Sequence, residues 1–119
     1  MQKLAKREEQ IMQACWHLGN AFIKEIITEL PEPRPHYNSV ATMVRILEEK
    51  GFLDHESFGN TFRYFPVISK EEYQKHAMGD IVKQYFNNSY TSMLVFFAKE
   101  QKLSKKELAE ILSIIKSKK

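Results

Sequence analysis

Three polar side chains at helical spacing have the chemistry needed to recognise nucleic-acid bases. In the stretch HYNSVATMVRILEEKGF, residues 36–52, Asn38, Thr42 and Arg45 fall on one side of a helical wheel. An asparagine amide can pair with adenine through two hydrogen bonds, an arginine can bind guanine or a phosphate, and a threonine can contact a thymine methyl group. The pattern therefore indicates a helix that contacts base edges in a groove.

Two further residues flank this polar side. Ser39 and Ala41 are small, and Ala41 offers a second methyl group for contact with thymine. Two other interpretations stay open for the polar side. Any exposed helix carries polar residues, and Asn38 and Ser39 are also typical residues for capping a helix.

The opposite side of the same stretch predicts how the helix is held. Val40, Met43, Val44 and Leu47 follow the i, i+3, i+4, i+7 spacing of a helix that packs on a core. We expect the helix to end where Lys50 is followed by a glycine, a common C-terminal cap.

Two helices precede it. Apolar residues recur at helical spacing over residues 4–18, and Gly19-Asn20 predicts a stop. A shorter helix is predicted over residues 23–30, because three prolines within residues 31–35 forbid its continuation.

A β-hairpin is predicted after the third helix. The aromatic and β-branched runs FLDHESF and TFRYFPV are separated by Gly59-Asn60, which suits a type II′ turn. Pro66 marks the end or the edge of the second strand, since proline cannot donate a ladder hydrogen bond. Near the tip, Asn60, Thr61 and Arg63 can contact phosphates or the minor groove. A solvated turn is the alternative, which the sequence favours for Asn60.

The element order predicts a mainly α fold with a small β-hairpin. Three helices and a hairpin within residues 1–68 are the order of a winged helix-turn-helix, in which the third helix enters the DNA major groove and the hairpin is the wing. Residues 69–119 predict three more helices, since SKEE (69–72) and SKKE (104–107) are capping boxes and Asn87-Asn88 is a break. We expect this second region to be a dimerisation domain.

The second region carries more apolar surface than isolated helices can hide. A second copy of the chain would bury it, which predicts a homodimer. The residues predicted to form this interface are Tyr85, Phe86, Tyr90, Met93, Leu94, Phe97, Leu108, Ile111, Leu112 and Ile115.

Charge and composition restrict the classes of function that are open to the protein. The net charge of +3 is concentrated after residue 101, and residues 1–51 are neutral, which keeps open a winged helix that binds a protein instead of specific DNA. Neither a nucleophile cluster nor a glycine-rich phosphate loop is present, so we expect no enzyme and no cofactor. The four histidines are far apart in the sequence and Cys15 is expected in the core, which predicts no metal site.

No apolar run approaches the length of a membrane span, so we expect no membrane insertion and a cytoplasmic protein.

Several segments in order resemble the penicillinase-repressor family, the BlaI/MecI/CopY group of bacterial transcriptional regulators. EEQIMQACW resembles its first helix, and NSVATMVRILEEKGFL its recognition helix and the following turn. GNTFRYFPVISKEE is similar to its wing and fourth helix, and SMLVFFAKEQKLSKKELAEI to its last two helices. The resemblance covers nearly the whole chain.

The resemblance implies a homodimeric repressor that binds double-stranded palindromic operator DNA built on TACA and TGTA and controls resistance or stress genes. It also implies release through a membrane sensor-protease signal that leads to cleavage between Phe96 and Phe97, where this sequence has Phe96 in place of the asparagine of the best-known members. The tail ILSIIKSKK lacks the cysteine motif of the copper branch, so copper sensing of that kind is not expected.

Overall fold

The computed structural model describes residues 1–117, with side chains described as far as Ile114. The chain divides into two compact units, Met1–Lys75 and His76–Lys119. The predicted division into a DNA-binding domain of residues 1–68 and a dimerisation domain of residues 69–119 remains a prediction about function.

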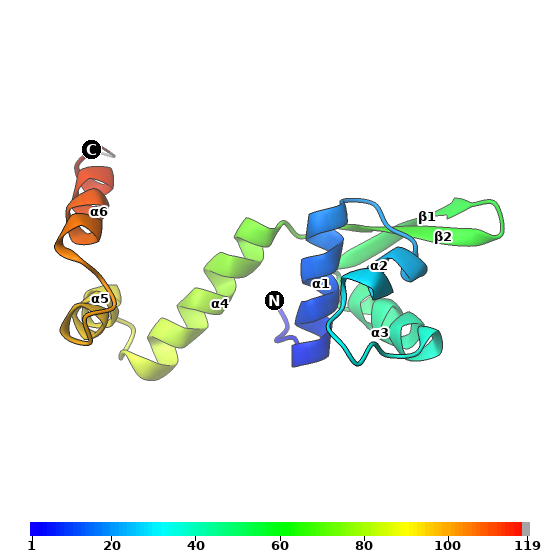
Figure 1. The fold of residues 1–119 in the computed structure, drawn as a ribbon, viewed down its shortest axis with the longest axis horizontal. Coiled ribbons are helices and arrows are strands. Elements are labelled where there is room, and N and C mark those ends of the chain that lie inside the picture. Colours follow the sequence, from blue (N-terminus) through cyan, green and yellow to red (C-terminus); the bar gives the residue numbers. More distant parts are fainter. Residues whose placement is uncertain (118–119) are drawn as a thin grey trace. The chain divides into compact units, whose positions relative to one another are not determined.

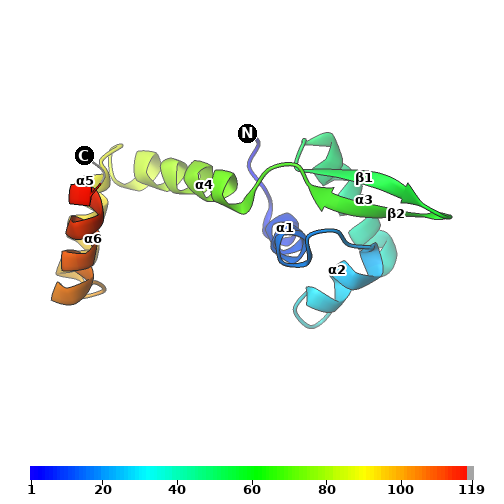
Figure 2. The ribbon, with the colours of Figure 1, turned by 90° about the horizontal axis from the view of Figure 1, so that it is seen from above.

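The first unit has the order predicted from the sequence. Helices α1 (Lys6–Leu18), α2 (Ile23–Glu29) and α3 (Tyr37–Glu49) are followed by strands β1 (Leu53–Phe58) and β2 (Thr61–Pro66). The two strands form an antiparallel hairpin that projects beyond the three helices (Figures 1 and 2). This arrangement is a winged helix-turn-helix, as predicted, and we call the hairpin the wing.

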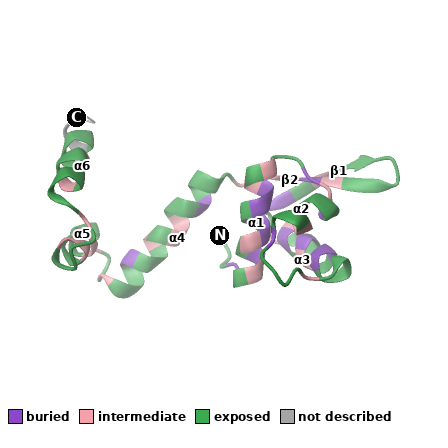
Figure 3. Ribbon diagram, in the orientation of Figure 1, coloured by how far each residue is buried: buried purple, intermediate pink, exposed green. Residues whose placement is uncertain are grey.

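The apolar stripes of the three helices meet in one core. Buried residues lie on α1–α3 and the base of the wing, while the tip of the wing is exposed (Figure 3). The largest fully buried side chains of this core are those of Ile11, Met12, Cys15, Ile26, Val40, Val44, Leu47, Phe52 and Leu53. Burial raises the pKa of the Cys15 thiol to about 12, so Cys15 is a small core residue, as expected.

The first helix begins later than the sequence pattern indicates. Leu4 is buried, with 3% of its surface exposed, yet α1 starts at Lys6 after the cap residue Ala5. The Glu8 carboxylate accepts a hydrogen bond from the Ala5 amide at 2.8 Å, and this bond caps the N-terminus of α1 at Ala5. Leu4 therefore packs on the core from an extended segment.

The turn of the wing follows the prediction. Phe58 pairs with Thr61, which leaves Gly59 and Asn60 as a two-residue loop. Gly59 has a φ of 64° and Asn60 is not among the residues with positive φ, the pattern of a type II′ turn. Pro66 lies opposite Leu53 at the end of β2, where its missing N–H breaks no further pairing.

A third strand, reduced to one residue, joins the wing to the helices. Ala21 forms an antiparallel bridge with Tyr64, with one hydrogen bond of 2.9 Å and a reciprocal one of 2.8 Å. This bridge could not be predicted from the sequence, because a single extended residue between two helices has no periodicity. It attaches the middle of β2 to the α1–α2 loop.

The exit of the wing is also anchored. The Trp16 indole N–H donates to the Ile68 carbonyl at 2.9 Å, and the Trp16 ring lies 5.6 Å from that of Tyr73. Tyr73 also packs on the edge of Phe52. Since Tyr73 lies in the first turn of α4 (Lys70–Tyr85), the first compact unit extends to Lys75 and not only to residue 68.

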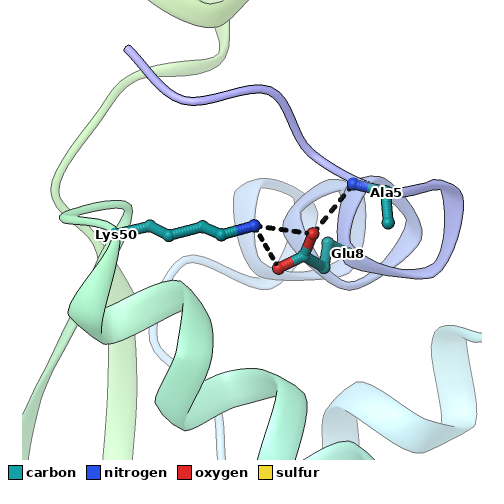
Figure 4. Close-up of polar contacts among 3 residues, drawn as sticks. All are labelled: Ala5, Glu8 and Lys50. Carbon is teal, nitrogen blue, oxygen red and sulfur yellow. Dashed lines mark hydrogen bonds and ion pairs between the residues drawn. The ribbon is translucent and has the colours of Figure 1, made fainter.

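An ion pair connects α1 with the end of α3. Lys50 Nζ lies 3.0 and 2.9 Å from the two carboxylate oxygens of Glu8, and both side chains are largely buried (Figure 4). Burial by itself would raise the pKa of Glu8, but the hydrogen bonds from Ala5 and Lys50, together with the Lys50 charge, outweigh it and lower the pKa. The pair fixes the C-terminal end of α3 against α1.

The second unit contains the rest of α4, then α5 (Tyr90–Lys99) and α6 (Lys105–Ser117). Both predicted capping boxes are present: Ser69 with Glu72 begins α4, and Ser104 with Glu107 begins α6. Asn87 and Asn88 both have positive φ, which breaks the helix where the sequence indicated.

None of the helices within residues 1–117 combines the length and the apolar character that crossing a membrane requires.

We expect Glu8→Gln to lower the free energy of unfolding of the first unit by about 1–3 kcal/mol, because a neutral amide binds Lys50 more weakly than a carboxylate. The folded-state pKa of Glu8 is depressed, so its contribution is complete above the unfolded-state pKa and is lost as the pH falls through the folded-state value. Urea unfolding followed by the fluorescence of Trp16, the single tryptophan, measures this at neutral pH and at about pH 3.

The matched control is Glu71→Gln. Glu71 and Lys75 form an exposed pair at 3.7 Å one helical turn apart, a type that contributes about 0.3–0.5 kcal/mol. Equal losses in the two variants, or a Glu8→Gln effect that persists undiminished in acid, would contradict the assignment.

Candidate nucleic-acid interface

Four of the predicted contact residues lie exposed on one helix. Asn38, Ser39, Thr42 and Arg45, which we call the polar strip, are all exposed on α3. The Thr42 hydroxyl donates to the Asn38 carbonyl at 3.0 Å, which leaves its methyl group available for apolar contact. The strip therefore keeps amide, hydroxyl, methyl and guanidinium groups on the exposed side of α3.

The prediction for Ala41 is contradicted. Its side chain is buried, with 6% exposed, so it cannot contact a thymine methyl group. Ala41 is three residues before the buried Val44, and the core of the helix bundle extends over this flank of α3. Met43, predicted in the core, is instead half-buried.

The capping interpretation of Asn38 and Ser39 is also wrong. The N-cap of α3 is His36, and both residues lie within the first turn of the helix. His36 provides no side-chain cap, so the exposed Asn38 and Ser39 remain available for other contacts.

Arg45 borders an open cleft of about 340 Å³ between α3 and the wing. In addition to Arg45, the cleft is lined by Glu48, Glu49, His55, Phe62 and Tyr64. Among the described residues, Arg45 has no ion-pair partner. Its charge is therefore available to an anion that approaches the helix.

Side chains from both sides of the cleft contact one another. His55 Nδ1 of β1 lies 2.9 and 3.0 Å from the carboxylate oxygens of Glu48 on α3, and the His55 ring packs on Phe62 at 4.3 Å. Burial, and then the charge of Glu48, raise the pKa of the Tyr64 phenol. The contact between Glu48 and His55 could not be predicted from the sequence, because it forms only when the chain reverses at Gly51.

The tip of the wing is exposed, including Asn60 and Thr61, and their contact with DNA remains a prediction. Arg63 is half-buried and already paired: its Nη2 lies 2.9 Å from Glu56 Oε1, and its guanidinium lies 5.1 Å from the centre of the Phe58 ring. The pairing follows from the register, which places Glu56 opposite Arg63. A phosphate contact by Arg63 therefore requires competition with Glu56.

Two aromatic residues of the wing are exposed near its turn, which was not predicted from the sequence. Phe58 and Phe62 flank the turn and are 53% and 46% exposed. Side chains alternate between the two faces of each strand, and this alternation could have indicated that the two rings are exposed. The aromatic runs by themselves predicted only strands.

The second unit exposes much of its apolar surface. Of the residues predicted at a dimer interface, Tyr85 is 71% exposed, Tyr90 55% and Leu112 55%. The half-buried members of that set are Phe86, Met93, Leu94, Phe97, Leu108 and Ile111. The rings of Phe86, Phe96 and Phe97 form a cluster, and α5 has no fully buried residue. The side chain of Ile115 lies outside the described residues.

A helix with an exposed polar strip, directly followed by a wing, defines a winged-helix DNA-binding protein. The family model described as "Penicillinase repressor" matches residues 4–117. The chain belongs to the penicillinase repressor family, and the protein is a transcriptional repressor.

Two curated relatives can be aligned with this sequence over nearly its whole length. The chain is 25% identical to the penicillinase repressor of Bacillus licheniformis over 114 residues, which are 95% of this chain and 89% of the relative. It is 20% identical to the methicillin resistance regulatory protein MecI of Mammaliicoccus sciuri over 117 residues, 98% and 95% of the two chains. A solved structure titled "CopR Repressor Structure" is 29% identical, with a TM-score of 0.48, and covers 57% of this chain and 100% of its own.

We expect Arg63→Ala to weaken binding to all DNA sequences similarly and to flatten the dependence of log affinity on log salt by about one unit. Glu56→Gln should do the opposite, since it releases the Arg63 guanidinium from its partner. Fluorescence anisotropy with two unrelated duplexes across a salt series measures both. Loss at one base position only in Arg63→Ala, or no gain in Glu56→Gln, would refute the phosphate assignment.

Proposed function

We propose that the protein is a homodimeric repressor that binds palindromic operators of the TACA/TGTA type. In this proposal α3 of each protomer enters the major groove and the wing contacts the neighbouring backbone or minor groove. The observation that supports it most directly is the exposed Arg45 on the polar strip beside the wing, which has no ion-pair partner in the described part of the chain. A dimer would place the two α3 helices about one DNA turn, roughly 34 Å, or a multiple of it, apart.

The apolar surface of the second unit supports the dimer. Exposed rings and aliphatic side chains on the end of α4 and on α5 and α6 lower the free energy when they leave water, by about 25 cal/mol for each Å² buried. A groove of about 450 Å³ along this surface is lined by residues such as Tyr85, Phe86 and Phe96. A second copy of the same chain would supply a matching apolar surface.

Dimerisation would also control DNA affinity. Two half-sites bound by one dimer gain from effective concentration, whereas a single winged helix binds one half-site alone. Release of DNA would then require no change in the polar strip, because weakening the association of the C-terminal helices is sufficient.

The principal experiment is fluorescence anisotropy of the full chain on a TACA/TGTA dyad duplex and on a scrambled duplex. We expect one dimer per dyad, and we expect Arg45→Ala to weaken dyad binding by about 1–3 kcal/mol while affecting the scrambled duplex less. Equal, weak binding to both duplexes would contradict the proposed operator and favour a protein partner. Unchanged dyad affinity in Arg45→Ala would remove Arg45 from the interface.

We expect Leu112→Glu to raise the dimer dissociation constant by roughly tenfold or more, because it buries a charge in an apolar interface. Sedimentation velocity over a concentration series measures the effect. Ser113→Glu is the matched control, since the exposed Ser113 is adjacent in α6 but polar. A dimer that is unchanged by Leu112→Glu, or weakened equally by both variants, would contradict the assigned surface.

We further propose that proteolysis in α5 releases the repressor. The bond between Phe96 and Phe97 lies inside a helix, where Phe96 is 48% exposed and Phe97 half-buried. Cutting there would separate α6 from the rest of the second unit and remove part of the proposed interface. Intact-mass analysis of the protein from β-lactam-treated cells should detect a fragment ending at Phe96; only full-length chain in cells that have lost repression would exclude this route.

A further inference from the structure

Three potential metal ligands converge beside the cleft between α3 and the wing. Glu48 lies in the last turn of α3, and Asp54 and His55 are in β1. One carboxylate oxygen from each acid and one imidazole nitrogen all lie within 4.8 Å of one another. Within the described residues this is the single group of three or more His, Cys, Asp or Glu side chains with such spacing.

Within the described residues, the His55 imidazole is the one basic side chain that contacts either carboxylate of this group. Within residues 1–117, neither Glu48 nor Asp54 has a lysine or arginine nitrogen at ion-pair distance, although the carboxylates of Glu8, Glu32 and Glu56 do. Among the described residues, the Glu48 carboxylate forms its polar contact with the His55 ring, and Asp54 Oδ1 accepts the His55 backbone amide at 2.7 Å. Two negative charges are therefore held together with one imidazole to offset them.

The imidazole is held in place by more than its polar contacts. The His55 ring packs on Phe62 at 4.3 Å and on Tyr64 at 5.6 Å, and Tyr64 is buried and bridged to Ala21. The side chains of His55 and Glu48 remain about one-third exposed, at 31% and 28%. The ligands are thus preorganised by the wing while water and ions can reach them.

We propose that Glu48, Asp54 and His55 form a binding site for a divalent transition-metal ion, with Zn²⁺ as the best match. Zn²⁺ accepts imidazole nitrogen and carboxylate oxygen, and with three protein ligands it keeps a position for water. An ion bound through His55 Nδ1 would take the place of the contact between Nδ1 and Glu48, and the neutral imidazole would then carry its proton on Nε2. The histidine and cysteine pattern of the sequence predicted no metal site. Glu48 comes close to Asp54 and His55 only because the chain reverses at Gly51.

The consequence for DNA binding rests on the proposed function. Glu48 and Glu49 line the same cleft as Arg45, and carboxylates there repel a phosphate that approaches between α3 and the wing. A bound cation would offset the charges of Glu48 and Asp54 and would connect α3 to β1. We therefore expect Zn²⁺ to tighten DNA binding.

Metal binding is measured first, without DNA, on the chelator-treated full chain. Isothermal titration with Zn²⁺ and visible absorption with Co²⁺ should both show one ion per chain. Glu48→Gln and Asp54→Asn keep the size of the side chain and one acceptor oxygen but remove the negative charge, so each should weaken binding by at least about tenfold. Far-UV circular dichroism establishes that each variant is folded.

Asp80→Asn is the matched control. Asp80 lies 3.4 Å from His76 in a two-residue pair without a third ligand, so its loss should leave Zn²⁺ binding unchanged. Dissociation constants above about 1 mM for the wild type, or equal weakening in Asp54→Asn and Asp80→Asn, would overturn the site.

The effect of Zn²⁺ on DNA binding is then measured separately from Zn²⁺ binding itself. Anisotropy on the dyad duplex with and without Zn²⁺ should show tighter binding in the wild type and no change in Asp54→Asn. Zn²⁺ binding without an effect on DNA would overturn the proposed role of the ion while leaving the site. Absence of dyad binding in both conditions would count against the proposed operator and not against the site.

Discussion

The orientation of α3 is the constraint on which the interface depends. Its apolar side, with Val40, Val44 and Leu47 completely buried, can face only the core formed with α1 and α2. The polar strip is then forced to the exposed side. The pair of Glu8 and Lys50 fixes the end of the helix against α1, so rotation of α3 would cost both apolar burial and a partly buried charge pair.

The wing is positioned by the same unit. Gly51, with a φ of 84°, turns the chain back after α3, and the bridge between Ala21 and Tyr64 attaches β2 to the α1–α2 loop. At the exit, Trp16 holds the Ile68 carbonyl. Helix and wing are therefore fixed to one core, and an ordered interface needs no large rearrangement on binding.

The electrostatics of the first unit favour specificity over bulk attraction. Arg63 is neutralised by Glu56, and Glu48 and Glu49 lie beside Arg45. The net charge of the whole chain is only +3, so bulk charge contributes little attraction to a phosphate backbone. The proposed pairing of two protomers and the proposed cation beside the cleft would each increase the affinity for DNA without altering the polar strip.

The sequence by itself determined the order of the main elements and most of their ends. Helical spacing gave α1 to α3, glycine and asparagine gave the turn of the wing, and two capping boxes gave the starts of α4 and α6, because these signals act between residues a few positions apart. Only the tertiary structure decided what depends on distant neighbours. Ala41 is buried because of the helices packed around it, Arg63 is paired because of strand register, and Glu48 meets Asp54 and His55 because the chain reverses at Gly51. Such contacts follow from packing and register, and no local pattern in the sequence encodes them.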